Sequence, residues 1–117
     1  MHQQELLKGN TDTLLLALLQ AEPMYGYQIV KEVDVKSSGY FAFKEGTLYP
    51  ALHRLERDKL IQGRWEDTPN NVRRRYYLIT AKGQEALIDR LSEWQKFTRA
   101  MDSIMLSPEL PQGREEI

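Results

Sequence analysis

The sequence contains no cysteine among its 117 residues. Disulfide bonds, zinc–thiolate centres and thiol nucleophiles are therefore excluded, and a reducing compartment is the natural setting. Long apolar runs are absent too, since the longest, Leu14 to Leu19, is far too short to span a bilayer. Residues 1–5 lack the basic stretch and the small-residue cleavage site of a signal peptide. We therefore expect a cytoplasmic protein with no membrane partner.

Catalytic and metal-binding patterns are also missing. The chain has two histidines, His2 and His53, and neither has a metal-ligand companion at a useful spacing. There is no HExxH motif, no glycine-rich phosphate loop and no GxSxG motif. Adjacent acids such as Glu66 and Asp67 fall where a turn is expected, and charged residues in turns usually face solvent. We expect no catalytic residue, no metal site and no cofactor, and therefore not an enzyme.

Charge is unevenly distributed along the chain. The formal net charge is −1, which argues against a protein that coats nucleic acid indiscriminately. Residues 44–75 nevertheless hold eight basic and five acidic side chains, a net charge of +3, while the remainder carries −4. A basic middle between acidic ends suits a single DNA-facing surface. An ordinary solvated face is the alternative.

Two helices are expected in the first third of the chain. A leucine-rich stretch predicts the first, which Asn10 or Thr11 can cap and which Pro23 ends. Hydrophobic periodicity predicts the second over residues 25–36. Residues 40–43 then form a short strand or an extended link.

A third helix carries a buried stripe. Leu48, Leu52 and Leu55 follow the i, i+4, i+7 spacing of one helix face. A proline in the first turn loses no hydrogen bond, whereas deeper in a helix it costs about 3 kcal/mol or more. Pro50 therefore places the first well-formed turn near Gly46–Thr47.

A hairpin and a long helix complete the pattern. Residues 60–66 and 73–79 are strand-like, and residues 67–71 between them are dense in turn formers. Thr80 is a good N-cap for a helix over residues 81–105.

This order predicts a mainly α fold with a small β-hairpin (α+β), the winged form of the helix-turn-helix, with an additional long helix. We expect a winged-helix DNA-binding domain over residues 1–79, a dimerisation helix over 80–106 and a loose tail over 107–117.

The third helix is the expected recognition helix, because its outward residues can reach phosphates and base edges. Tyr49 could instead be half-buried packing, and Arg54 and Arg57 could serve solubility by pairing with Glu56 and Asp58. Arginines follow the hairpin turn and could straddle phosphates or enter the minor groove; a solvated edge strand is the alternative. The predicted DNA-binding residues are Lys44, Thr47, Tyr49, Pro50, His53, Arg54, Arg64, Arg73, Arg74 and Arg75.

The last helix carries an apolar seam interrupted only by Thr98. One helix this long cannot bury such a seam against a complete module, so a second copy of the chain is the simplest cover. Folding back on Leu6, Leu7 and Leu14 is the alternative, and both arrangements can coexist. The predicted dimerisation residues are Leu6, Leu87, Leu91, Trp94, Met101, Ile104 and Met105, with Phe97 widening the stripe.

Four blocks of sequence together resemble the PadR family of transcriptional regulators. The most specific are Gly-Thr-Leu-Tyr-Pro-Ala-Leu from Gly46 and Tyr-Leu-Ile-Thr-Ala-Lys-Gly ending at Gly83. Weaker blocks begin at Leu6 and Tyr25, and the resemblance extends to about residue 106.

The resemblance implies a dimeric winged-helix repressor of detoxification, efflux or stress genes that binds a palindromic operator. It also implies the compact subfamily, some members of which resemble multidrug sensors with a tryptophan lining a pore between the two chains. Trp94 stands at the matching place, and the tryptophan pair could sandwich a planar aromatic compound; packing is the alternative. The candidate ligand-binding residues are Trp94, Phe97, Leu91 and Leu7.

The chain departs from the family pattern at two positions. Lys44 replaces the usual helix-capping residue, so the recognition helix has a less defined start. Lys59 replaces a glycine before the wing and would be mildly strained at positive φ. A winged-helix module that binds an acidic protein instead of specific DNA remains the alternative function.

Overall fold

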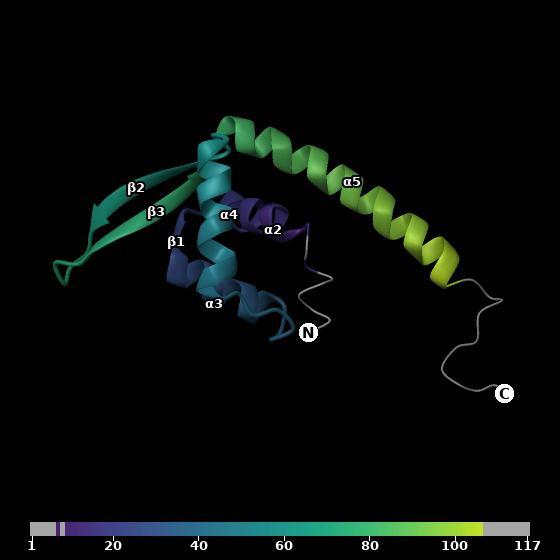
Figure 1. The fold of residues 1–117 in the computed structure, drawn as a ribbon, viewed down its shortest axis with the longest axis horizontal. Helices are drawn as coiled ribbons and strands as arrows, with labels where there is room; N and C mark the ends of the chain where they lie inside the picture. The colour runs from purple at the N-terminus through teal and green to yellow at the C-terminus, as the bar shows by residue number, and fades with distance from the viewer. Residues whose placement is uncertain (1–6, 8, 107–117) are drawn as a thin grey trace. The chain divides into compact units, whose positions relative to one another are not determined.

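The structure is a computed structural model that describes residue 7 and residues 9–106. The described chain is mainly helical with a small antiparallel sheet, which confirms the predicted fold class (Figure 1). Its elements are α2 (Thr11–Ala21), β1 (Met24–Tyr25), α3 (Gly26–Lys36), α4 (Glu45–Arg57), β2 (Ile61–Asp67), β3 (Arg73–Ile79) and α5 (Ala81–Met105). Among the described residues, no helix is long and apolar enough to cross a membrane.

The chain divides into two compact units, residues 1–87 and residues 88–117. The division falls within α5, beyond the junction expected between residues 79 and 80. The first turns of α5 therefore belong to the first unit.

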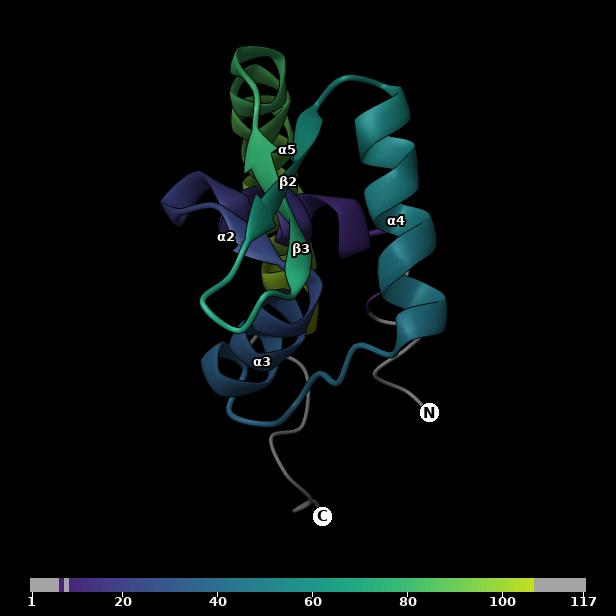
Figure 2. The same ribbon diagram turned by 90° about the vertical axis from the view of Figure 1, so that its left-hand side faces the viewer.

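A three-stranded sheet with the order β1-β3-β2 lies beside the helices of the first unit. β2 and β3 form the predicted hairpin in full antiparallel register, from Ile61 opposite Ile79 to Asp67 opposite Arg73. Figure 2 shows α4 beside this hairpin, which is the wing of the fold. The sequence pattern did not predict β1, which adds Met24–Tyr25 to the free edge of β3. Residues 40–43 form an extended link without strand pairing among the described residues.

The core of the first unit lies between the helices and the base of the wing. The predicted leucine stripe of α4 is fully buried, together with Ala51. The stripe belongs to one hydrophobic cluster with members from every other element of this unit, and α4 packs on α2, α3 and β2. The largest buried side chains are Leu15, Leu16, Ile29, Leu48, Leu52, Leu55 and Ile61.

α4 begins at Glu45, close to the predicted first turn near Gly46–Thr47. Lys44 is the N-cap and makes no side-chain capping hydrogen bond, in keeping with a less defined start. Pro50 consequently falls in the second turn, where its missing N–H leaves one backbone bond of α4 unmade. After α4, Lys59 has a φ of 63°, so the chain turns through the left-handed conformation that favours glycine.

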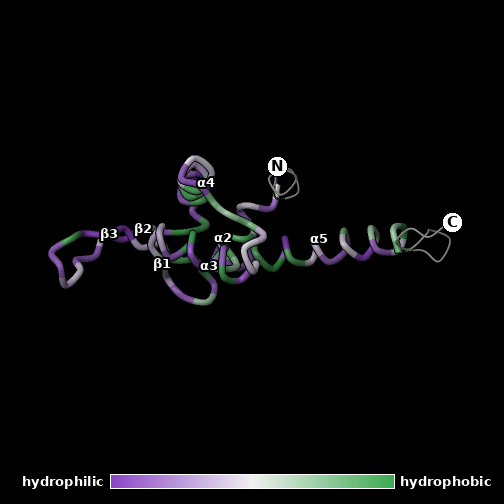
Figure 3. Tube along the Cα trace, turned by 90° about the horizontal axis from the view of Figure 1, so that it is seen from below, coloured by the Kyte–Doolittle hydropathy of each residue, from purple (hydrophilic) through white to green (hydrophobic). Residues whose placement is uncertain are grey.

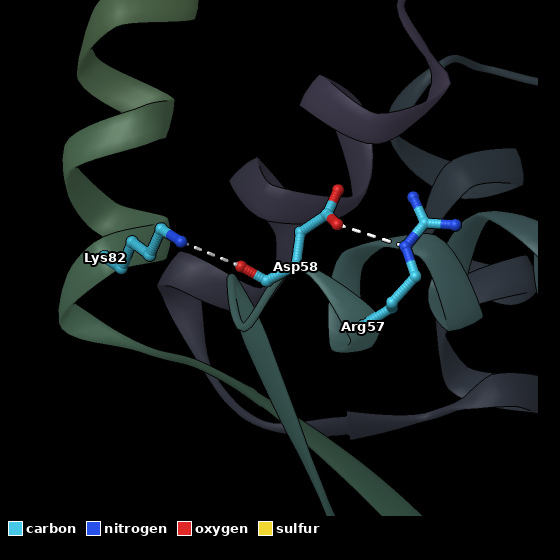
Figure 4. Close-up of polar contacts among 3 residues, drawn as sticks. All are labelled: Arg57, Asp58 and Lys82. Carbon is cyan, nitrogen blue, oxygen red and sulfur yellow. Dashed lines mark hydrogen bonds and ion pairs between the residues drawn. The ribbon is translucent and has the colours of Figure 1, made fainter.

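The start of α5 is fixed to the end of α4. Thr80 is the predicted N-cap: its hydroxyl oxygen accepts from the Gly83 N–H at 3.0 Å, and its backbone N–H donates to the Leu60 carbonyl at 3.1 Å. Figure 4 shows a second tie, in which Lys82 Nζ donates to the Asp58 carbonyl at 3.2 Å. The Asp58 carboxylate meanwhile accepts from Arg57 Nε at 3.1 Å, as the solubility interpretation of Arg57 expects.

Candidate nucleic-acid interface

The outward face of α4 is polar and accessible. Lys44, Thr47, Pro50 and His53 are all exposed. Arg54 is exposed as well, and its Nη2 donates to Asp12 Oδ1 at 2.9 Å, a partner on α2 rather than the predicted Glu56. A helix with a buried leucine stripe and this opposite face has the surface that major-groove readout requires.

Tyr49 combines packing with exposure. Its side chain is 38% exposed. A Cβ placed on Gly26 would lie 2.5 Å from Tyr49 Oη, so the tyrosine lies directly over the start of α3. The predicted packing role and the predicted outward position are therefore both present in one side chain.

The two faces of the wing differ in their contacts. Arg75 and Tyr77 lie on the face toward α4, and Tyr77 is buried. Arg74 and Tyr76 lie on the other face against Tyr25, as the predicted alternation requires. Figure 3 shows that the wing is mainly hydrophilic toward its tip.

The arginines of the wing differ in whether a carboxylate pairs with them. Arg73 lies 3.5 Å from Asp67 in a highly exposed pair, and Arg64 lies 2.8 Å from Glu66. Exposed pairs of this kind contribute about 0–1 kcal/mol, so both arginines can exchange their carboxylates for phosphates at little cost. Arg74 has no ion-pair partner among the described residues, and its guanidinium lies 4.3 Å from the centre of the Tyr25 ring.

Arg74 lies on the face of the wing away from α4 and contacts the end of β1. The Tyr25 ring under Arg74 belongs to the residue before Gly26, and Gly26 lies under Tyr49 of α4. Of the three arginines at residues 73–75, Arg75 contacts α4 directly, through Glu56. We call the ten predicted residues of α4 and the wing the α4–wing surface; they are Lys44, Thr47, Tyr49, Pro50, His53, Arg54, Arg64, Arg73, Arg74 and Arg75.

Arg75 is held differently from the other arginines of this surface. Its Nη2 donates to Glu56 Oε2, and the same oxygen accepts from the Gly63 backbone N–H at 3.2 Å. Burial raises the pKa of the neighbouring Tyr77 hydroxyl above its ordinary value, although the positive charge of Arg75 opposes the shift. Sequence reasoning missed the parts played by Glu56, Gly63 and Tyr25. For Arg75 the sequence did carry a signal, because the period-2 alternation places residue 75 on the same face as residue 77. It carried no such signal for the other three residues.

The exposed part of α5 carries the predicted seam. Leu91, Trp94, Met101, Ile104 and Met105 are exposed, and green and purple alternate along this helix in Figure 3. Thr98 donates its hydroxyl to the Gln95 carbonyl at 3.2 Å, so this polar residue is satisfied within its own helix.

The predicted ligand and dimer residues fall into three groups. Trp94 and Phe97 stack with ring centres 5.9 Å apart and an interplanar angle of 29°. Leu87 and Leu7 are instead buried in the core of the first unit. Leu6 lies outside the described residues.

The described residues contain no group of three or more histidine, aspartate or glutamate side chains that could hold a metal ion. The α4–wing surface presents arginine guanidinium groups together with exposed polar side chains of α4. Such a surface can bind a polyanion by charge and by shape.

Comparison with known proteins agrees with this architecture. The transcriptional regulator PadR-like family matches residues 15–89. A relative from Lysinibacillus sphaericus, named as uncharacterized protein X, is 30% identical over 105 residues, covering 90% of this chain and 96% of its own. A transcriptional regulator from Clostridium thermocellum has a TM-score of 0.79 and 31% identity, with 86% and 97% of the two chains covered. A PadR-like regulator from Bacillus cereus has a TM-score of 0.77 and 28% identity, with 88% and 98% covered. The chain belongs to the PadR-like family of transcriptional regulators.

Proposed function

We propose that the protein is a homodimeric, sequence-specific DNA-binding regulator that represses its target genes. The observation that carries this proposal is the α4–wing surface, in which a polar recognition helix adjoins a strand with three consecutive arginines. In a dimer, two recognition helices would read half-sites about one helical turn, ~34 Å, apart on a palindromic operator. Detoxification, efflux or stress genes are the proposed targets, by resemblance to the family.

The apolar seam of α5 supports the dimer. Most of the stability of a helix in a protein comes from packing of its apolar face, and the apolar side chains of α5 beyond residue 87 are exposed in the single chain. The seam is interrupted only by Thr98, whose hydroxyl donates within its own helix, so a second copy can cover the seam without leaving this hydroxyl unsatisfied. A C2 dimer presents the same face of both chains to each other.

The test of DNA binding removes charge from the wing. Arg73→Gln with Arg74→Gln should weaken binding to DNA from upstream of the protein's own gene. It should also reduce the slope of log affinity against log salt by about 0.9 for each phosphate that the variant no longer neutralises. Lys31→Gln with Lys36→Gln removes the same charge from exposed positions on α3 outside the surface and serves as the control.

Two results would contradict the proposal. An unchanged slope and affinity in the wing variant would remove the wing from the interface. A dimer that shows no salt-sensitive, sequence-preferring binding would favour the alternative function, a winged-helix module for an acidic protein partner.

We also propose that a planar aromatic ligand at the seam relieves repression. The exposed, stacked Trp94 and Phe97 rings support it, because flat aromatic compounds bind such platforms by stacking. The chain has two tryptophans, so Trp65→Phe leaves Trp94 as the sole fluorescent indole. Quenching of Trp94 by a panel of planar compounds is the expected result in this variant. The single variant Trp94→Phe, which keeps the Trp65 indole, should show no quenching. A panel without any response would leave Trp94 as interface packing.

A further inference from the structure

One carboxylate joins the wing to the recognition helix. Glu56 lies in the last turn of α4, and its Oε2 accepts from Arg75 on β3 and from the Gly63 N–H on β2. Both strands of the wing are therefore tied to the same side-chain atom of α4. We name these residues, Glu56, Arg75 and Gly63, the wing clip.

The wing clip depends on the absence of a side chain at position 63. A Cβ on Gly63 would lie 2.5 Å from Arg75 Cζ and 2.6 Å from its Nε, too close for any real contact. The guanidinium thus occupies the space a side chain would fill. It also lies 5.6 Å from the centre of the Trp65 ring and 5.8 Å from that of Tyr77. The position of Arg75 is defined from several sides.

Arg75 is also the least exposed arginine among the ion pairs of the described residues. Its side chain is 32% exposed and that of Glu56 30%, against 65% and 84% for Arg73 and Asp67. An exposed pair exchanges its carboxylate for phosphate readily, whereas a partly buried pair with a second donor on the same oxygen does not. The charge of Arg75 is therefore compensated inside the protein.

We propose that Arg75 is a positioning residue that acts through Glu56 to set the wing against α4, and that Arg73 and Arg74 make the phosphate contacts. The inference rests on the proposed DNA-binding function. The three adjacent arginines therefore have two roles. Arg73, which has an exchangeable carboxylate partner, and Arg74, which has no ion pair among the described residues, bind DNA phosphates. Arg75 fixes the angle at which the wing approaches the DNA.

The DNA experiment compares the same substitution at adjacent positions. In a dimer, Arg74→Gln leaves one phosphate in each half-site without its arginine and should reduce the salt slope by about 1.8. Arg75→Gln should leave the slope unchanged but weaken operator binding about three- to tenfold, because fewer wings are aligned. Equal reductions of the slope in the two variants, or wild-type affinity in Arg75→Gln, would overturn the proposal.

A charge-neutral control separates alignment from repulsion. Glu56→Gln combined with Arg75→Gln removes the ion pair without changing the net charge. The double variant should bind as weakly as Arg75→Gln. If it instead recovers wild-type affinity, the weaker binding of the single variant came from the uncompensated Glu56 carboxylate, and the positioning role is wrong.

A measurement without DNA decides the wing clip independently of the proposed function. Hydrogen exchange of the backbone amides of β2 in the free protein should be faster in Arg75→Gln than in the wild type and unchanged in Arg74→Gln. Equal exchange in all three proteins would overturn the clip. If the wild type binds no DNA, the proposed function fails, while exchange still decides whether Arg75 holds the wing.

Discussion

Gly83→Ala should destabilise the protein, although alanine has a higher helix propensity than glycine. A Cβ there would lie within 2.8 Å of Ile79 Cγ1 and 3.0 Å of the Leu60 carbonyl carbon, and it would overlap the Leu60 carbonyl oxygen. These neighbours are mostly backbone, which cannot rotate away as the end of a flexible side chain can. The first turn of α5 must therefore move outward in Gly83→Ala.

The magnitude follows from what that movement breaks. Alanine in place of glycine stabilises a helix interior by about 1 kcal/mol. Against this, overpacking costs about 1–3 kcal/mol. The bond that the Thr80 backbone N–H donates to the Leu60 carbonyl, at 3.1 Å, is worth about 1 kcal/mol. We expect Gly83→Ala to reduce the free energy of unfolding by about 1–3 kcal/mol.

Gly46→Ala is the matched control, because it places the same methyl group in α4, where nothing lies within 4 Å of the added Cβ. It should stabilise the protein by up to about 1 kcal/mol. Urea unfolding of the DNA-free proteins at one fixed concentration measures both, since the stability of a dimer depends on concentration. A Gly83→Ala protein as stable as wild type would refute the steric argument.

Three further outcomes are expected. Met101→Glu puts a charge in the α5 seam and should make the protein sediment as a monomer, whereas Ser92→Glu on the same helix should leave the dimer intact. A Met101→Glu protein that still sediments as a dimer would contradict the proposal that the seam forms the dimer interface. Gly26→Ala should displace Tyr49 and weaken DNA binding while costing less than about 1 kcal/mol in urea unfolding, because a tyrosine end can swing aside. That weakening must disappear in a Tyr49→Ala background. Because burial raises the pKa of Tyr77, its hydroxyl loses its proton at lower pH in the unfolded chain than in the folded protein. The free energy of unfolding therefore falls as pH rises above about 10. Tyr77→Phe should lessen the fall in urea unfolding between about pH 9 and 11, and equal declines would argue against it.

Local patterns predicted the elements because local forces determine them. The alternation after the hairpin turn matches β3 at both ends, and Thr80 caps α5 through the hydroxyl that the sequence indicated. Because a proline inside a helix leaves one backbone hydrogen bond unmade, Pro50 indicated a first turn near Gly46–Thr47, and α4 begins at Glu45. Four fully or almost fully buried residues of α4 outweigh that bond, so the helix tolerates proline in its second turn.

Contacts between distant residues were beyond the reach of such patterns. The alternative interpretation paired Arg54 with a nearby acid, Glu56 or Asp58, yet its partner Asp12 lies 42 residues away. Glu56 and Arg75 are 19 residues apart, and only the fold brings them together. The two-residue strand β1 is too short to produce a period, and it exists because β3 offers a free edge.

The exposed ion pairs of the arginines bear on how an acidic protein could bind DNA selectively. In the free protein, Arg54, Arg64 and Arg73 each have a carboxylate partner on an exposed surface. Each such pair is weak, so phosphate can replace the carboxylate, but the released acid then remains near the DNA and repels it. Only a duplex that places phosphates at all these positions together can offset that repulsion. A DNA site of the correct shape meets this condition, whereas DNA bound without a fixed register does not. The carboxylate partners of these arginines would therefore lower non-specific affinity more than specific affinity.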